Sequence, residues 1–233
     1  MTESILVTGA SRGIGFETCR ALVKNNTDCN IVMVARDSEV FTRAAKKLRS
    51  ETKDCKVIKI TADLSNKNSV ESIFEEIEKH NINLTAIVNN AGFTKPAPIN
   101  EISTEDFELT MRINLFTPFE LVKTAILRSH PLENVVNIAS TAGIEGRAGW
   151  LTYSASKAAL INMSEVMRKE LAPLGVRITT LSPGRCATDL RRTLAPEEDP
   201  TSIMQAHQVA DVVRLMTTEA GRVLMSQNLV VRT

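Results

Sequence analysis

The chain has 233 residues, of which 43% are hydrophobic and 24% are charged, as in an ordinary globular protein. Its net charge of +1 and aromatic content of 4% give no basis for binding nucleic acid or an anionic membrane. No apolar run is long enough for a membrane span, and the first residues lack the features of a secretory signal, so we expect a cytoplasmic protein. The four cysteines form no C-x-x-C pair and have no histidine nearby at metal-ligand spacing, so we expect reduced thiols and no metal site.

Short β-rich runs alternate with longer helical patterns along the chain. Strands are expected at residues 5–8, 30–35, 56–62, 85–89, 134–139, 176–181 and 228–231. Helices are expected at residues 14–25, from the second strand to residue 48, and at 69–80, 104–111, 115–129, 152–172 and 206–217. This alternation predicts βαβ units and an α/β fold with a parallel sheet and helices on both faces. We expect residues 1–233 to form one domain, in which the charged, proline-bearing segment 185–205 is a loop over the substrate.

A glycine-rich turn joins the first expected strand to the first expected helix. It reads Thr8-Gly9-Ala10-Ser11-Arg12-Gly13-Ile14-Gly15. Glycines let the chain turn sharply and let the backbone approach a pyrophosphate at the positive end of a helix. A merely tight turn is the alternative, but the strand–turn–helix context favours dinucleotide binding. The T-G-x-x-x-G-x-G spacing resembles the short-chain dehydrogenase/reductase family, which implies a Rossmann-type, doubly wound sheet of about seven strands and a nicotinamide cofactor.

The end of the second strand indicates which nicotinamide cofactor is bound. Enzymes that select NAD place an acidic residue there to hold the ribose 2′-hydroxyl, whereas here Ala35 is followed by Arg36. In the fold of the family, Arg12 lies close enough to join Arg36, and two guanidinium groups suit a 2′-phosphate. We therefore expect NADP(H), with Asp37 pointing away. The alternative is that both arginines are solvated surface residues.

Further motifs follow in the order that the family shows. The resemblance implies cofactor contacts after the third, fourth and sixth strands, from Asp63, Leu64, Asn90, Ala91, Gly92, Pro183, Gly184, Cys186 and Thr188. The first two resemble the adenine contact of the family, and the P-G-x-x-x-T segment is implied to close over the nicotinamide carboxamide. Cys186 is expected to contribute its backbone, with a redox-sensing thiol as the alternative.

Asn114, Ser140, Tyr153 and Lys157 match the active-site tetrad of the family in order and approximate spacing. The spacing of Tyr153 and Lys157 places both side chains on one face of the expected helix. A tyrosine ordinarily titrates near pH ~10, and an adjacent ammonium together with an oxidised nicotinamide would lower its pKa toward neutrality.

The resemblance assigns a role to each member of the tetrad. It implies that Tyr153 is the general acid–base and that Lys157 lowers the pKa of Tyr153 and binds the nicotinamide ribose. It implies further that Ser140 polarises the substrate carbonyl and that Asn114 anchors a water of a proton relay. Taken alone, Ser140 and Asn114 could be caps and Tyr153 a packing residue, but their order behind the nucleotide motifs favours catalysis.

The substrate side is less specified by the sequence. Phe93, Gly146 and Trp150 are expected there, although Trp150 fits the core or a subunit interface equally well. The short stretch between Thr188 and the helix at 206–217 suggests an open site.

These motifs together predict an NADP(H)-dependent oxidoreductase that interconverts a small-molecule carbonyl and an alcohol, with 3-oxoacyl compounds among its possible substrates. The alternative is a non-catalytic NADP(H)-sensing regulator on the same fold. All four tetrad residues are present, which favours the enzyme. The segments at 103–129 and 151–172 resemble the helices with which members of the family build a tetramer, so a homotetramer or homodimer is expected.

Overall fold

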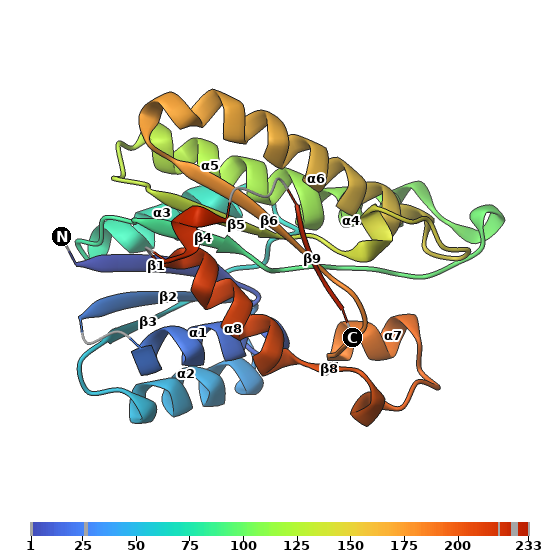
Figure 1. Ribbon diagram of the computed structural model, residues 1–233, viewed down its shortest axis with the longest axis horizontal. Coiled ribbons are helices and arrows are strands. Elements are labelled where there is room, and N and C mark those ends of the chain that lie inside the picture. Colours follow the sequence, from blue (N-terminus) through green and yellow to red (C-terminus); the bar gives the residue numbers. More distant parts are fainter. Residues whose placement is uncertain (1, 26–27, 219, 225–227, 233) are drawn as a thin grey trace.

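A seven-stranded parallel sheet forms the centre of the protein in this computed structural model, which describes residues 2–25, 28–218, 220–224 and 228–232 (Figure 1). Its strands are β1 (Glu3–Thr8), β2 (Cys29–Ala35), β3 (Lys56–Thr61), β4 (Ala86–Asn89), β5 (Asn134–Ile138), β6 (Arg177–Pro183) and β9 (Leu229–Val231). They lie in the order β3-β2-β1-β4-β5-β6-β9, and every neighbouring pair is parallel. The predicted doubly wound α/β fold is therefore confirmed.

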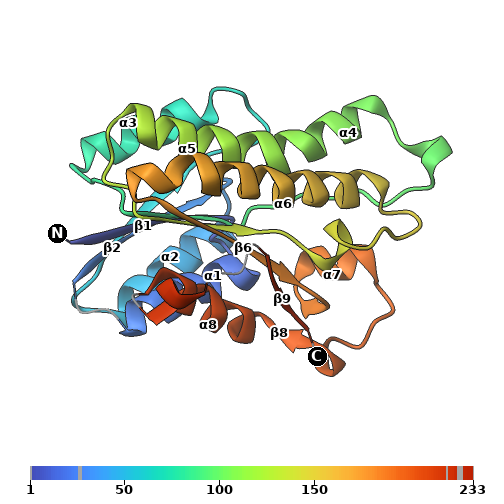
Figure 2. The ribbon, with the colours of Figure 1, turned by 45° about the horizontal axis from the view of Figure 1, so that its top comes forward.

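Helices cover both faces of this sheet (Figure 2). One face carries α1 (Gly13–Asn25), α2 (Glu39–Glu51) and α8 (Ala206–Thr217). The other carries α3 (Ser69–Lys79), α4 (Thr104–Met111), α5 (Thr117–Leu127) and α6 (Leu151–Leu171). Successive side chains of a strand point to opposite faces, so Ile5 and Val7 of β1 enter one apolar cluster and Leu6 enters the other. Among the described residues, no helix has both the length and the apolar character needed to cross a membrane.

The strand order reverses between β1 and β4, which are neighbours although about eighty residues separate them in the chain. Ligands of open parallel sheets bind at the carboxyl ends of the strands beside such a reversal. Here the segments that follow β1 and β4 are the glycine-rich turn and the run Asn90-Ala91-Gly92. The topology therefore brings together two motifs that the sequence singled out separately.

The helix expected at 115–129 is interrupted at its start. Residues Arg112–Phe116 form a π-turn, and α5 begins only at Thr117. Pro118 has no N–H for the carbonyl of Asn114 four residues earlier, so a regular α-helix cannot continue there. The hydroxyl of Thr117 donates to the carbonyl of Arg112 over 2.9 Å and satisfies it within the turn.

The segment 185–205, which we predicted as a loop over the substrate, contains regular elements. It contains β7 (Cys186–Ala187), α7 (Asp189–Leu194) and β8 (Met204–Gln205), and β7 pairs with β8 in a small parallel sheet. The hydroxyl of Thr188 accepts the N–H of Arg191 over 3.1 Å and so caps α7. Short 3₁₀ turns complete the chain at Ile99–Glu101, Thr141–Gly143, Ala172–Leu174, Pro200–Ser202 and Ala220–Val223.

Candidate active site

The glycine-rich turn lies between β1 and α1 and is fixed from the side by the segment after β4. The hydroxyl of Thr8 accepts the N–H groups of Asn90 and Ala91, each over 3.0 Å. The side-chain amide of Asn90 donates to the carbonyl of Thr8 over 2.9 Å. These bonds hold both motifs in register at the carboxyl ends of the two central strands.

Only glycine fits at the centre of this turn. Gly9 has a φ of 66°, and a Cβ added to Gly15 would lie 2.4 Å from the carbonyl oxygen of Gly9. The first-turn N–H groups of α1 have no helical acceptor and carry the positive end of the helix dipole. The turn therefore fits a pyrophosphate. The Cβ that Gly13 lacks would contact Thr188 at 3.5 Å, so the segment after β6 lies over the turn.

The arginines expected at a 2′-phosphate have different surroundings. Arg36 is exposed, and its charge assists two Ser65 hydrogen bonds that hold the pKa of Asp63 below its usual range. Arg12 was expected to join Arg36. It forms an ion pair with Asp189 of α7, with 2.6 Å between the nitrogen and the oxygen. Asp37 is exposed, and its carboxylate lies 3.6 Å from the ammonium of Lys59.

Three other expected cofactor residues, Leu64, Gly184 and Cys186, make contacts within the protein that limit what each can offer a cofactor. The side chain of Leu64 packs in the core, so only its main chain is left for an adenine contact. The N–H of Gly184 donates to the carbonyl of Val231 over 2.8 Å, which ties this loop to β9. Cys186 is buried, and burial raises the pKa of its thiol to about 11, which disfavours the reactive thiolate that a redox sensor needs.

Tyr153 and Lys157 lie side by side on α6, with the ammonium 5.8 Å from the centre of the phenol ring. Both side chains are buried, and the ammonium donates to the carbonyl of Ile138 at the end of β5 over 2.7 Å. Burial lowers the pKa of Lys157 to about 8, because the charged form loses hydration.

The pKa of Tyr153 differs from the sequence-based expectation. Burial raises it, while a side-chain hydrogen bond with Ser140 and the positive charge of Arg191 act in the opposite direction. In the protein without cofactor, burial has the largest influence on the pKa of Tyr153, and not the lowering by Lys157 that we expected. Ser140 also accepts the N–H of Ala142 over 3.1 Å, so it is a turn cap and a neighbour of Tyr153 at once.

Asn114 lies in the π-turn and is fully buried. Its amide oxygen accepts the N–H of Phe93 over 2.8 Å, and its amide nitrogen donates to the carbonyl of Phe93 and the hydroxyl of Ser156, each over 2.9 Å. Because the side chain has these partners, a water in a proton relay would need the main-chain carbonyl, for which Pro118 supplies no donor. A Cβ on Gly92 would lie within 4 Å of both Asn114 and Lys157, so the two are neighbours.

A polar chain through the core supports this arrangement, and we did not predict it. Asn89 of β4 donates to the side chain of Asn137 of β5 over 2.8 Å, and Asn137 donates to Ser164 of α6 over 2.8 Å. Gly143 lets the segment that carries Ser140 approach α6, since a Cβ there would lie 2.6 Å from the carbonyl carbon of Lys157. Polar residues inside otherwise apolar strands were the available signal.

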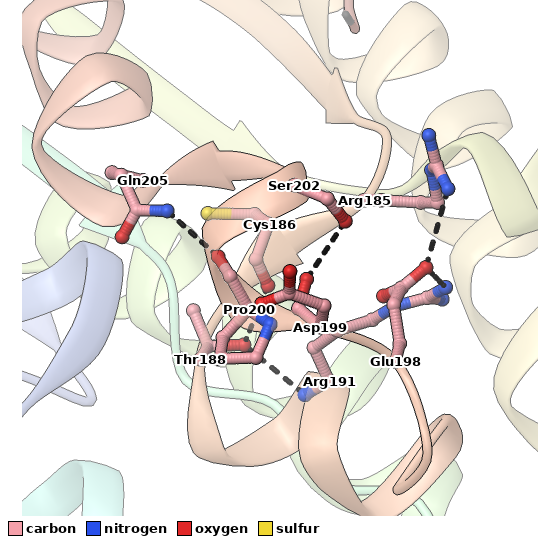
Figure 3. A network of polar contacts seen from close by, with 9 residues as sticks. All are labelled: Arg185, Cys186, Thr188, Arg191, Glu198, Asp199, Pro200, Ser202 and Gln205. Carbon is pink, nitrogen blue, oxygen red and sulfur yellow. Dashed lines mark hydrogen bonds and ion pairs between the residues drawn. The ribbon is translucent and has the colours of Figure 1, made fainter.

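Trp150 is half-buried and packs edge-on against Tyr153, with 6.4 Å between the ring centres. Trp150 was expected either on the substrate side or in the core or a subunit interface, and in the structure it lies beside Tyr153. Gly146, also expected on the substrate side, is exposed, and a Cβ there would meet no atom within 4 Å. Arg191 of α7 lies over the Trp150 ring. It also forms an ion pair with Glu198 (Figure 3). No sequence motif pointed to Arg191 or Glu198. Within the described ranges, no group of three His, Cys, Asp or Glu residues could hold a metal ion.

Comparison with known proteins agrees with this geometry. The short chain dehydrogenase family matches residues 3–199. Carbonyl reductase family member 4 of Xenopus tropicalis is 32% identical over 207 residues, which are 88% of this chain and 83% of that protein. The 3-oxoacyl-[acyl-carrier-protein] reductase of Synechocystis is 29% identical over 221 residues, which are 92% and 88% of the two chains.

A solved structure covers almost the whole fold. A blue fluorescent protein from a metagenomic library, in complex with NADPH, superposes with a TM-score of 0.85 at 26% identity over 98% of this chain and 96% of its own. The protein belongs to the short-chain dehydrogenase family of oxidoreductases.

Proposed function

We propose that the protein is an NADP(H)-dependent oxidoreductase that interconverts a carbonyl and an alcohol, with Tyr153 as its general acid–base. The observation that carries this proposal is the joint position of Tyr153, Lys157 and Ser140 at the carboxyl end of β5, beside a turn that fits a pyrophosphate. Relatives named carbonyl reductase and 3-oxoacyl reductase support the reaction class, and the NADPH complex of the structural relative supports the cofactor.

When bound, the cofactor supplies or accepts the hydride. Gly9, Gly13 and Gly15 would hold its pyrophosphate, and Arg36 its 2′-phosphate. Ser140 orients the substrate oxygen, and Tyr153 gives that oxygen a proton in reduction or takes it in oxidation. Lys157, which contacts the carbonyl of Ile138, would bind the cofactor ribose and exchange a proton with solvent through a water held by the main-chain carbonyl of Asn114.

This assignment is tested with purified protein, NADPH and a panel of ketones, diketones and 3-oxoacyl thioesters, while NADPH absorbance is followed. We expect turnover of at least one class and a loss of about 10²–10⁴-fold in Tyr153→Phe, the usual contribution of a positioned acid. Trp150 fluorescence should still report NADPH binding to that variant. NADPH binding without turnover across the panel, or full activity of Tyr153→Phe, would contradict the proposal.

We also propose that the protein assembles as a homo-oligomer through the helical face formed by α5 and α6. Apolar side chains on this face stay exposed in the single chain, among them Phe119, Leu127 and Val166. Burial of such groups between subunits is favourable in water.

A further inference from the structure

The guanidinium of Arg191 is held by two neighbours, Glu198 and Trp150, of which Figure 3 shows Glu198. Its Nε and Nη2 atoms donate to the two carboxylate oxygens of Glu198 over 2.6 and 2.8 Å, which is the bidentate geometry of a strong ion pair. Its central carbon lies 5.5 Å from the centre of the Trp150 ring, within the range of a cation–π contact. The two charged side chains are only 14% and 16% exposed. Arg191 is therefore a rigid charge and not a solvated one.

This charge lies next to the proposed general acid–base. Trp150 contacts Arg191 and meets Tyr153 edge-on, with an angle of 76° between the two rings. Lys157 from α6 itself and Arg191 from α7 are the charged groups beside Tyr153. Arg147 also lies over the Trp150 ring, at 5.2 Å, but it is exposed to solvent. Its neighbour from the segment after β5, Ser140, is neutral, and Asn114 on the π-turn packed against α6 is neutral as well.

The two cations behave differently with pH. The pKa of Lys157 is lowered to about 8, so in the protein without cofactor its ammonium loses its proton at mildly alkaline pH. An arginine stays protonated throughout this range. Arg191 is consequently the permanent positive charge at the phenol.

We propose that Arg191, clamped by Glu198 and stacked on Trp150, is a positioning residue that stabilises the phenolate form of Tyr153. The inference rests on the proposed function, since it takes Tyr153 to be the acid–base group. The lowering influence of Arg191 on the pKa of Tyr153 is consistent with this geometry. Because α7 belongs to the segment that we expect over the substrate, the position of this segment would then set how readily Tyr153 gives up its proton.

The composition of the chain permits a direct test, because Tyr153 is its only tyrosine and Trp150 its only tryptophan. The near-ultraviolet absorbance of tyrosinate therefore titrates one group, without any substrate. We expect Arg191→Met and Arg191→Gln to move this titration upward by about one pH unit, a typical perturbation in folded proteins. Arg191→Lys should show a smaller upward shift than the two neutral variants, because it keeps a positive charge.

Arg192→Met is the matched control, since Arg192 lies on the same short helix but its side chain is 75% exposed. It should titrate like the original protein. Trp150 emission at each pH checks that the variants stay folded. Unchanged titration in both neutral variants, or an equal shift in Arg191→Lys, would overturn the inference. Absence of turnover alone would contradict the proposed function and leave the titration result standing, so the two failures are distinguishable.

Discussion

Lys157 is a single residue that destabilises the fold, because it buries a charge at the candidate site. Lys157 is 3% exposed, and its ammonium has one described oxygen partner, the carbonyl of Ile138. Desolvation of a charge is expensive, and one neutral acceptor offsets only part of it. The fold tolerates this cost at the position where a cofactor and the phenol of Tyr153 would use the charge.

The first prediction concerns Lys157→Met. The pKa of Lys157 is lowered to about 8 in the folded chain, so between that pH and the higher pKa of the unfolded state the unfolded chain binds more protons. Lys157 therefore lowers the free energy of unfolding below pH ~8, and this loss diminishes as the pH rises toward ~10. We expect Lys157→Met to be more stable at neutral pH by roughly 1–3 kcal/mol, given about 1.4 kcal/mol for each pKa unit.

Urea unfolding between neutral and alkaline pH measures this difference. The advantage of the methionine variant should shrink as the pH rises, and turnover should be lost at every pH. A variant that is less stable than the original at neutral pH would contradict the assigned burial cost. Lys169→Met, at an exposed position of the same helix, is the control and should show no such pH dependence.

The second prediction concerns Arg36 and the choice of cofactor. Arg36→Asp replaces a cation with an acid that repels a 2′-phosphate and accepts a hydrogen bond from a 2′-hydroxyl. A charge-assisted contact contributes about 1.5–3 kcal/mol, so the preference for NADPH over NADH should fall about 10–100-fold. The ratio of kcat/KM for the two cofactors measures it.

Arg43→Asp provides the control for this experiment. Arg43 is 72% exposed on α2 and pairs with Glu39, one turn earlier, so its replacement changes the same charge without the proposed contact. We expect its cofactor ratio to stay within about twofold of the original, as for weak surface charges. Equal effects of the two variants would mean that the phosphate is attracted by general surface charge and not held by Arg36.

That the four residues of the candidate tetrad lie close together could be predicted from the sequence, because they have fixed spacing relative to a helix and to strand ends. Arg191 could not, because its meaning depends on a contact between α7 and the start of α6, which are distant in the chain. Arg12 illustrates the same limit. Its position in the turn is local information, but its ion pair with Asp189 depends on where α7 packs.

At the scale of elements, the turn between β1 and α1 is tightly constrained by close backbone approach. Gly15→Ala would place a Cβ 2.4 Å from the carbonyl oxygen of Gly9, a backbone atom that cannot yield without reshaping the turn. We predict a loss of about 1–3 kcal/mol in the free energy of unfolding, typical of overpacking, and a large loss of NADPH affinity. Thermal unfolding and Trp150 fluorescence titration measure the two effects.

Gly146→Ala is the control for the turn, since a Cβ at Gly146 would have no neighbour within 4 Å. Its stability and NADPH affinity should be unchanged. If Gly15→Ala bound NADPH as tightly as the original, the close approach of backbone and pyrophosphate would be the wrong account of this turn.

The periodicity of the sequence predicted the positions of most strands and helices. It did not predict the π-turn or the short helix α7. The helix expected at 115–129 has an apolar pattern that continues through the π-turn, so its period hides the break. The short helix α7 is too brief to show periodicity and depends on the cap at Thr188. Both departures lie at the candidate site, where tertiary contacts outweigh local preference.

At the scale of the molecule, the exposed apolar residues of α5 and α6 make a further prediction. Phe119→Glu puts a charge on the proposed interface and should reduce the mass measured by light scattering to that of a smaller assembly. Val40→Glu is the control, because Val40 on α2 is equally exposed, at 41%, on the opposite face. A mass that changes in both variants, or in neither, would contradict the proposed interface.

The π-turn has a consequence for how this chain is compared with its relatives. A π-turn holds one residue more than the corresponding turn of an α-helix. It is therefore equivalent to the insertion of one residue that leaves the helices on either side unchanged. Deleting one residue from Arg112–Phe116 would leave α5 near its present length but rotate Asn114 away from Phe93. A one-residue gap in an alignment at this point would therefore mark a chain that keeps the helix and loses the polar contact, a distinction that percentage identity does not record.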